Sequence, residues 1–311
     1  MNAGELLRAS RVVIVAGKGG VGKTTVTAAI ARLAAAEGMD TLVVEVEGKS
    51  GIAAMFDRPP LGYDESILWP RAGGGGEVRG RTLTPDDALL EYLDDHGMKR
   101  VSKRLVSSGA LDIVSTAVPG IKDILILGKV KQLEANRVAD LIVLDAPAAG
   151  HAITFLLAAR GLLDAVNVGP IHTQAREVLD LLTDPARCQV VLVTLPEETP
   201  VNELVETAFN LEDRVGVSLG PVVVNGVYPT LDGLDVDPVA AASDAGTTLR
   251  DGEADALRAA AAFRLQRTAL QQAQLERLSS TLPLDQLQLP FLFKANLGAE
   301  DLGVLAEALR S

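Results

Sequence analysis

The chain alternates between short apolar runs and longer stretches in which apolar residues recur at helical spacing. The short runs are nearly continuous in Val, Ile and Leu, a pattern typical of parallel strands that are buried on both faces of a sheet. The expected strands are Val12–Ala16, Thr41–Val46, Leu141–Leu144, Gln189–Val193 and Val222–Val224, with a weaker strand near Gln288–Leu292 and a further candidate at Val78–Leu83.

Helical periodicity fills most of the intervals between these runs. The expected helices are Thr24–Glu37, Thr84–Leu93, Gly120–Asn136, Ala152–Val166, Thr199–Leu211, Ala254–Leu278 and Glu300–Leu309. Strands that alternate with helices predict an α/β fold with a doubly wound, mainly parallel sheet. Ligands of such folds bind at the carboxyl ends of the strands, so we expect the functional residues there.

Three stretches depart from this alternation. Ala72–Gly76 includes four consecutive glycines, which predicts a flexible loop. Residues 84–118 are purely helical in pattern, and together with residues 154–183 they predict a small helical subdomain above the site. Residues 228–255 are rich in Asp, Gly and Ala, which predicts a mobile acidic loop. We therefore expect a single domain over residues 1–311.

Residues 17–25 read GKGGVGKTT and lie between an expected strand and an expected helix. They contain the phosphate-binding pattern G-x-x-x-x-G-K-[ST], in which glycines let backbone N–H groups point at phosphates. Lys23 is expected to reach the β- and γ-phosphates, and the Thr24 hydroxyl to ligate Mg²⁺. The candidate nucleotide-binding residues of this phosphate loop are Gly19, Gly20, Val21, Gly22, Lys23, Thr24 and Thr25.

Polar residues end three of the other expected strands. Asp145 follows four apolar residues, a Walker-B arrangement in which a carboxylate holds Mg²⁺ through a water. Glu45 and Glu47 share one face of their strand. For Glu47 we favour a role in positioning water over that of a solvated loop carboxylate. For Glu45 the sequence favours neither role. The amide of Asn225 suits the edge of adenine, but Asn-Gly is also a common turn dipeptide.

Charge and cysteine content narrow the partners and the compartment. A net charge of −12 argues against non-specific binding to nucleic acid or to anionic membranes. The single cysteine, Cys188, leaves no intramolecular disulfide and no internal cysteine pair for a metal, and its apolar neighbours predict a buried strand position. No apolar run approaches the ~18 residues of a membrane helix, and the N-terminus does not read as a signal peptide, so we expect a cytoplasmic protein.

Lys18 stands directly after the first glycine and gives the loop the form K-G-G-x-G-K-[ST]. This is the form of a deviant Walker A loop. Together with four further segments, it resembles the arsenite-pump and tail-anchored-protein targeting ATPase family, and in particular the half-size, single-domain members of that family. The four segments are VLDAPAAGHAITFL, TLTPDDALLEYL, AVPGIKDIL and PVVVNGV. The resemblance implies a P-loop NTPase fold and Mg²⁺-dependent binding and hydrolysis of ATP by a dimer that encloses nucleotide. It also implies that Lys18 acts across the dimer interface, that Asn225 lies at the adenine, and that ATP state is coupled to a client, which stays unidentified.

The chain departs from this family in several places. Judged by its spacing to Phe56, Glu47 stands where the family has an aspartate that activates the attacking water. The cysteines of the family's zinc and arsenite sites are absent, so neither site is expected. The resemblance implies that the partner is either a second copy or a related ATPase in a heterodimer. In the alternative reading, the chain is a slow or non-hydrolysing regulatory subunit of such a heterodimer.

Glu47→Asp tests that alternative. The extra methylene of glutamate displaces the carboxylate, and a misplacement of about 1 Å can lower a rate by about 10²-fold. If Glu47 limits hydrolysis, the variant will create ATP turnover or raise it by up to about this factor in a phosphate-release assay. Unchanged turnover would count against the regulatory reading.

Overall fold

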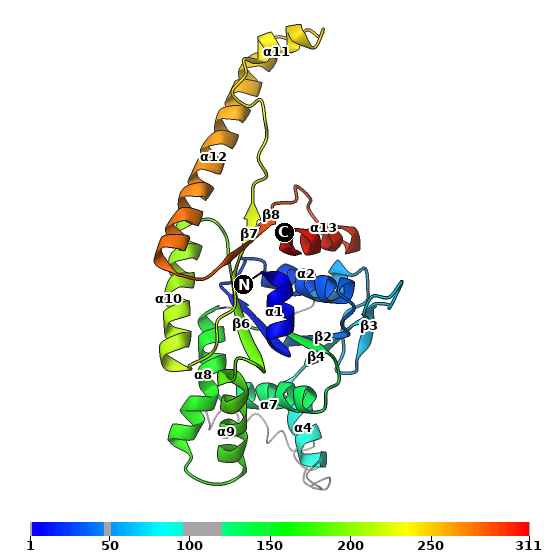
Figure 1. Cartoon of the computed structure of the whole chain (residues 1–311), viewed down its shortest axis with the longest axis vertical. Coiled ribbons are helices and arrows are strands. Elements are labelled where there is room, and N and C mark those ends of the chain that lie inside the picture. Colours follow the sequence, from blue (N-terminus) through cyan, green and yellow to red (C-terminus); the bar gives the residue numbers. More distant parts are fainter. Residues whose placement is uncertain (1, 47–50, 96–119, 148, 311) are drawn as a thin grey trace.

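The computed structural model describes residues 2–46, 51–95, 120–147 and 149–310. The strands of these residues form one sheet in the order β3-β4-β2-β5-β1-β6-β7-β8 (Figure 1). All neighbouring strands are parallel except β3, which runs antiparallel to β4. The strands are β1 (Val12–Gly17), β2 (Thr41–Val46), β3 (Ser66–Trp69), β4 (Val78–Leu83), β5 (Leu141–Asp145), β6 (Cys188–Thr194), β7 (Val222–Val227) and β8 (Gln286–Pro290). The mainly parallel α/β fold is thereby confirmed.

Helices cover both faces of this sheet and bury alternate residues of its strands. Val12 and Ile14 of β1 pack in a core with α7, α8, α9 and α10, whereas Val13 and Val15 pack with α1, α2 and α13. The central strand is buried on both sides, which is why its sequence is continuously apolar. The helices are α1 (Ala3–Ala9), α2 (Lys23–Ala36), α3 (Gly51–Met55), α4 (Pro85–Asp95), α7 (Ile121–Ala135), α8 (Ala149–Ala165), α9 (Pro170–Thr183), α10 (Glu198–Arg214), α11 (Pro238–Asp244), α12 (Glu253–Thr281) and α13 (Ala299–Arg310).

The acidic segment 228–255 differs from the loop that its composition suggests, because it contains α11. Asp237 caps this helix by accepting hydrogen bonds from the backbone N–H groups of Val239 and Ala240, and Pro238 occupies the first helical position. Arg258 of α12 also pairs with Asp237 at 2.8 Å. A local cap and an ion pair therefore order a helix where the composition indicates a loop. Figure 1 shows α12 projecting beyond the sheet, with α11 near its outer end.

The expected helical subdomain is described only in part, since residues 96–119 lie outside the described ranges. Its described helices are α4, α8 and α9, and α7 contacts all three. Glu91 of α4 pairs with Lys129 of α7 and accepts a hydrogen bond from Tyr63, which precedes β3 in the chain. Glu91 thus connects α4 to α7 and to the segment that leads into the sheet. Burial and the contact with Glu91 raise the pKa of the Tyr63 hydroxyl, so it stays a hydrogen-bond donor at neutral pH.

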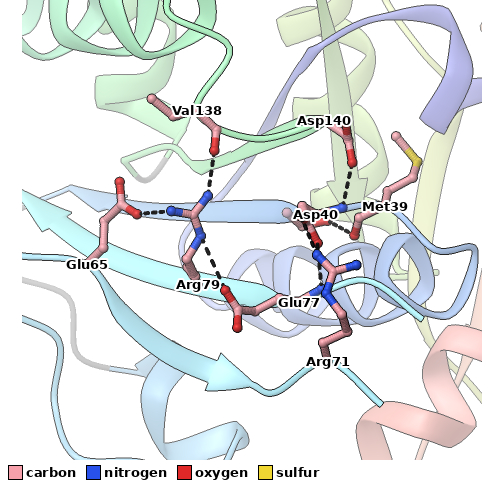
Figure 2. A network of polar contacts seen from close by, with 9 residues as sticks. Met39, Asp40, Glu65, Arg71, Glu77, Arg79, Val138 and Asp140 are labelled. Atoms are coloured by element: carbon pink, nitrogen blue, oxygen red, sulfur yellow. Dashed lines mark hydrogen bonds and ion pairs between the residues drawn. The ribbon is translucent and has the colours of Figure 1, made fainter. Parts of the chain in front are cut away.

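A polar network joins the amino-terminal ends of β2, β4 and β5 (Figure 2). The Asp40 carboxylate accepts hydrogen bonds from Arg71 and, at 3.0 Å, from the Glu77 backbone N–H. The Glu77 hydrogen bond, followed by the Arg71 guanidinium, lowers the pKa of Asp40. The Asp40 N–H in turn donates to Asp140 at 2.8 Å, so one aspartate connects three strands. This network lies at the sheet edge opposite the strand ends where ligands bind, which makes it structural.

Cys188, the first residue of β6, is wholly buried, as its apolar neighbours predict. Burial raises the pKa of its thiol to about 12. The thiol therefore stays protonated at neutral pH and packs as a small apolar side chain.

Gly76 ends the glycine-rich stretch that precedes β4 and packs directly on the backbone after α2. Its N–H donates to the Ala35 carbonyl at 2.8 Å. A Cβ at this position would lie 1.9 Å from the Met39 carbonyl oxygen. The close approach of two backbones, rather than loop flexibility, therefore explains the glycine here.

Gly76→Ala is expected to destabilise the protein by about 1–3 kcal/mol, because the added methyl group overlaps backbone atoms that can move only together with the sheet. Gly62→Ala is the matched control, since a Cβ there would meet no atom within 4 Å. Urea unfolding of both variants measures the difference. Equal stabilities would show that the Met39 contact does not constrain the fold.

Candidate nucleotide-binding site

The phosphate loop connects β1 to α2 at the carboxyl edge of the sheet. Gly22 has a φ of 91° and precedes the first residue of α2. A Cβ on Gly22 would lie 2.2 Å from Nδ2 of Asn225, so both conformation and space require glycine there. A Cβ on Gly20 would meet no atom within 4 Å, so the loop is open at that point. The arrangement leaves a bare stretch of backbone beside a helix N-terminus, which fits a phosphate group.

Lys23 lies at the start of α2, and its side chain is largely buried. Its Nζ donates a hydrogen bond to the Lys18 carbonyl at 2.9 Å, so the ammonium folds back along the loop. A buried ammonium next to a helix N-terminus gives this edge of the sheet a concentrated positive potential. Its position beside the loop makes Lys23 a candidate to contact a phosphate.

Thr24 and Asp145 are brought together by the pairing of neighbouring strands. Asp145 ends β5, which lies beside β1 with Val15 and Asp145 in register. The Thr24 hydroxyl donates a hydrogen bond to Oδ2 of this wholly buried carboxylate at 2.8 Å. Hydroxyl and carboxylate oxygens are the donors that Mg²⁺ prefers, so the pair fits a magnesium ion next to the loop.

Asn225 lies in β7 and contacts the phosphate loop directly. Its Nδ2 donates to the Val21 carbonyl at 3.0 Å. The same amide carries an oxygen acceptor, so it can also receive a hydrogen bond from an amino group. The structure thus brings Asn225 to the loop, 204 residues away from Val21 in the chain.

Of the two glutamates near the end of β2, the structure describes only Glu45. Glu47 lies outside the described residues. Glu45 is wholly buried and accepts a hydrogen bond from the backbone N–H of Ile52 at 3.1 Å, at the start of α3. Its carboxylate therefore links the end of β2 to the first turn of α3, a role that the sequence pattern left open.

Lys18 points to the side of the loop, where it forms an ion pair with Glu203 of α10. Both side chains are partly exposed. Sequence reasoning did not single out Glu203, because it is one of several glutamates on an amphipathic helix. Only the packing of α10 beside the loop distinguishes it from the others.

In the described ranges, no group of three or more His, Cys, Asp or Glu side chains is arranged to hold a metal ion. Over the same residues, no helix combines the length and the apolarity that crossing a bilayer requires.

Several known proteins are similar to this chain. The chain is 38% identical over 226 residues to the ATPase BagA of Mycobacterium tuberculosis, a match that covers 70% of this chain and 66% of BagA. It is 28% identical over 251 residues to protein Rv2184c of the same organism, covering 70% of this chain and 59% of that protein. It is 30% identical over 171 residues to the ATPase ARSA1 of Chlamydomonas reinhardtii, covering 49% and 22%. The chain thus spans just under two thirds of the length of BagA.

The family model described as anion-transporting ATPase matches residues 10–168, just over half of the chain. This range contains the whole phosphate loop and Asp145. This match agrees with the resemblance that the sequence motifs indicated. The chain therefore belongs to the anion-transporting ATPase family.

Proposed function

We propose that this protein is a Mg²⁺-dependent ATPase that dimerises around nucleotide and couples its ATP state to a client. The observation that carries the proposal is the contact between Thr24 and the buried Asp145 beside the phosphate loop. A hydroxyl and a carboxylate held next to a glycine-rich helix N-terminus suit a metal-bound polyphosphate better than any other common ligand.

The residues of the loop divide the binding of ATP among them. Backbone N–H groups from Gly19 to Thr25 surround the phosphates, and Lys23 leaves the Lys18 carbonyl to contact them. Thr24 and Asp145 hold Mg²⁺, which when bound neutralises charge on the phosphates. Asn225, already at the loop, turns its free amide positions toward adenine.

Hydrolysis requires two further residues in this proposal. Glu47 orients the attacking water, and Lys18 crosses to the nucleotide of the partner subunit, where it stabilises charge that develops during phosphoryl transfer. The partner is a second copy or a related ATPase, and the protein works in the cytoplasm. The client is unidentified, and the acidic balance of the chain favours neither nucleic acid nor direct membrane anchoring.

A regulatory subunit that binds ATP with little or no hydrolysis is the second candidate. The observation that favours it is the glutamate at position 47, where the resemblance implies an aspartate. In that case the chain completes its activity only beside a related ATPase.

Thr24→Val tests the magnesium site. Valine keeps the shape of threonine but removes the hydroxyl that contacts Asp145, and losing a metal-supporting contact commonly weakens metal affinity by about 10–100-fold. Calorimetric titration with ATP will show that the gain in affinity from Mg²⁺ falls by this order, while ATP affinity in a chelator changes little. Thr24→Ser, which keeps the hydroxyl, is the matched control and will bind like the unchanged protein. An unaltered magnesium effect in Thr24→Val would remove Thr24 from the site.

Lys23→Ala and Lys18→Ala separate binding from dimerisation. Lys23→Ala will lose ATP binding, ATP turnover and any ATP-dependent dimer. Lys18→Ala will keep ATP binding but lose the dimer and the turnover, since its role lies across the interface. Light scattering with Mg²⁺ and ATP, together with phosphate release, measures these properties. Normal dimerisation and turnover of Lys18→Ala would overturn the trans role of the lysine.

A further inference from the structure

The side chain of Lys18 is held by a carboxylate of its own chain. Its Nζ forms a hydrogen-bonded ion pair with Oε1 of Glu203. The Lys18 side chain is 44% exposed and that of Glu203 38%, so the pair lies at the surface beside the loop. The lysine that the proposed function sends across the interface is therefore engaged within its own subunit.

The position of Glu203 is fixed by its helix. Val201 and Leu204 of α10 are buried in the core against the sheet. On the side of α12, Glu197, the residue directly before α10, pairs with Arg267 at 2.9 Å, and Asn202 accepts a hydrogen bond from Arg277. Because α10 is held on both sides, it presents the Glu203 carboxylate at a defined place beside the phosphate loop.

The backbone of Lys18 is linked to the phosphate-binding lysine as well. Its carbonyl accepts the hydrogen bond from Lys23 Nζ at 2.9 Å. A phosphate that draws Lys23 away from this carbonyl therefore changes the surroundings of Lys18. Phosphate binding at Lys23 is therefore linked, through this carbonyl, to Lys18, whose side chain is paired with Glu203.

We propose that Glu203 is a positioning residue that retains Lys18 in its own subunit and competes with the contact across the dimer interface. This inference rests on the trans role of Lys18 in the proposed function. One ammonium group cannot approach Glu203 and a distant phosphate at the same time, so dimerisation has to break the ion pair. Partly exposed pairs of this kind shift an equilibrium by about two- to fivefold, which is enough to bias the lysine without blocking it.

Glu203→Gln tests this competition in the full-length protein with Mg²⁺ and ATP. The amide has nearly the same shape but lacks the charge, so Lys18 is released. Each dimer of this chain breaks two such pairs, so the factor for one pair is squared. The variant will dimerise at about 4- to 25-fold lower protein concentration in light scattering, and its turnover below saturation of the dimer will rise by a similar factor. At about 1 M salt, where the Debye length is ~3 Å, the difference from the unchanged protein will shrink, because screening weakens the ion pair in both.

Glu206→Gln is the matched control, since Glu206 is an exposed residue on the same helix, one turn away in the chain. It removes an equal charge and will leave both dimerisation and turnover unchanged. A double variant of Lys18→Ala with Glu203→Gln will behave like Lys18→Ala alone, because the carboxylate acts only through the lysine. Matching thermal unfolding midpoints will show that the variants are folded.

The outcomes separate the two proposals. If Lys18→Ala fails to dimerise while Glu203→Gln matches the unchanged protein or dimerises more weakly, the competition is overturned and the proposed function stands. An equal rise in Glu206→Gln would also overturn it, since the effect would then come from net charge. If Lys18→Ala dimerises and hydrolyses ATP normally, the trans role itself is overturned, and the competition with it.

Discussion

The hydrogen bond between Thr24 and the buried carboxylate of Asp145 is the contact around which this site is organised. A wholly buried carboxylate is costly unless polar groups surround it, and the sheet supplies them where β1 and β5 end together. Asp145 can occupy this place only because parallel pairing brings the ends of these strands to the same edge. The burial of both apolar strands thus fixes the positions of two oxygen atoms, the Thr24 hydroxyl oxygen and Oδ2 of Asp145.

The polar contacts at the two ends of the strands involve different partners. At the amino-terminal edge, Asp40, Arg71 and Asp140 connect neighbouring strands through mutual hydrogen bonds and ion pairs. At the carboxyl edge, the side chains of Lys23 and Asn225 bond to backbone carbonyls of the loop itself. Contacts of the first kind stabilise the sheet, whereas contacts of the second kind can be exchanged for a ligand.

The match to the anion-transporting ATPase family concerns only part of this chain. The family match covers the phosphate loop and Asp145. It does not extend to α10, α11 or α12, where Glu203 lies and where the chain projects beyond the sheet (Figure 1). The family match alone therefore carries no information about these helices.

The sequence by itself determined the fold class and the phosphate loop. Periodicity located the strands that form the sheet centre, because residues buried on both faces have to be apolar, and the glycines and lysines of residues 17–25 form a local pattern. It missed β3, α1 and α3, which are short and owe their order to packing or caps. It also placed a loop where Asp237 caps a helix. Only the tertiary structure decided the contacts of Asp145 with Thr24, of Asn225 with Val21 and of Glu203 with Lys18. Each joins residues more than a hundred positions apart, and such pairs depend on strand order and helix placement, which no local pattern encodes.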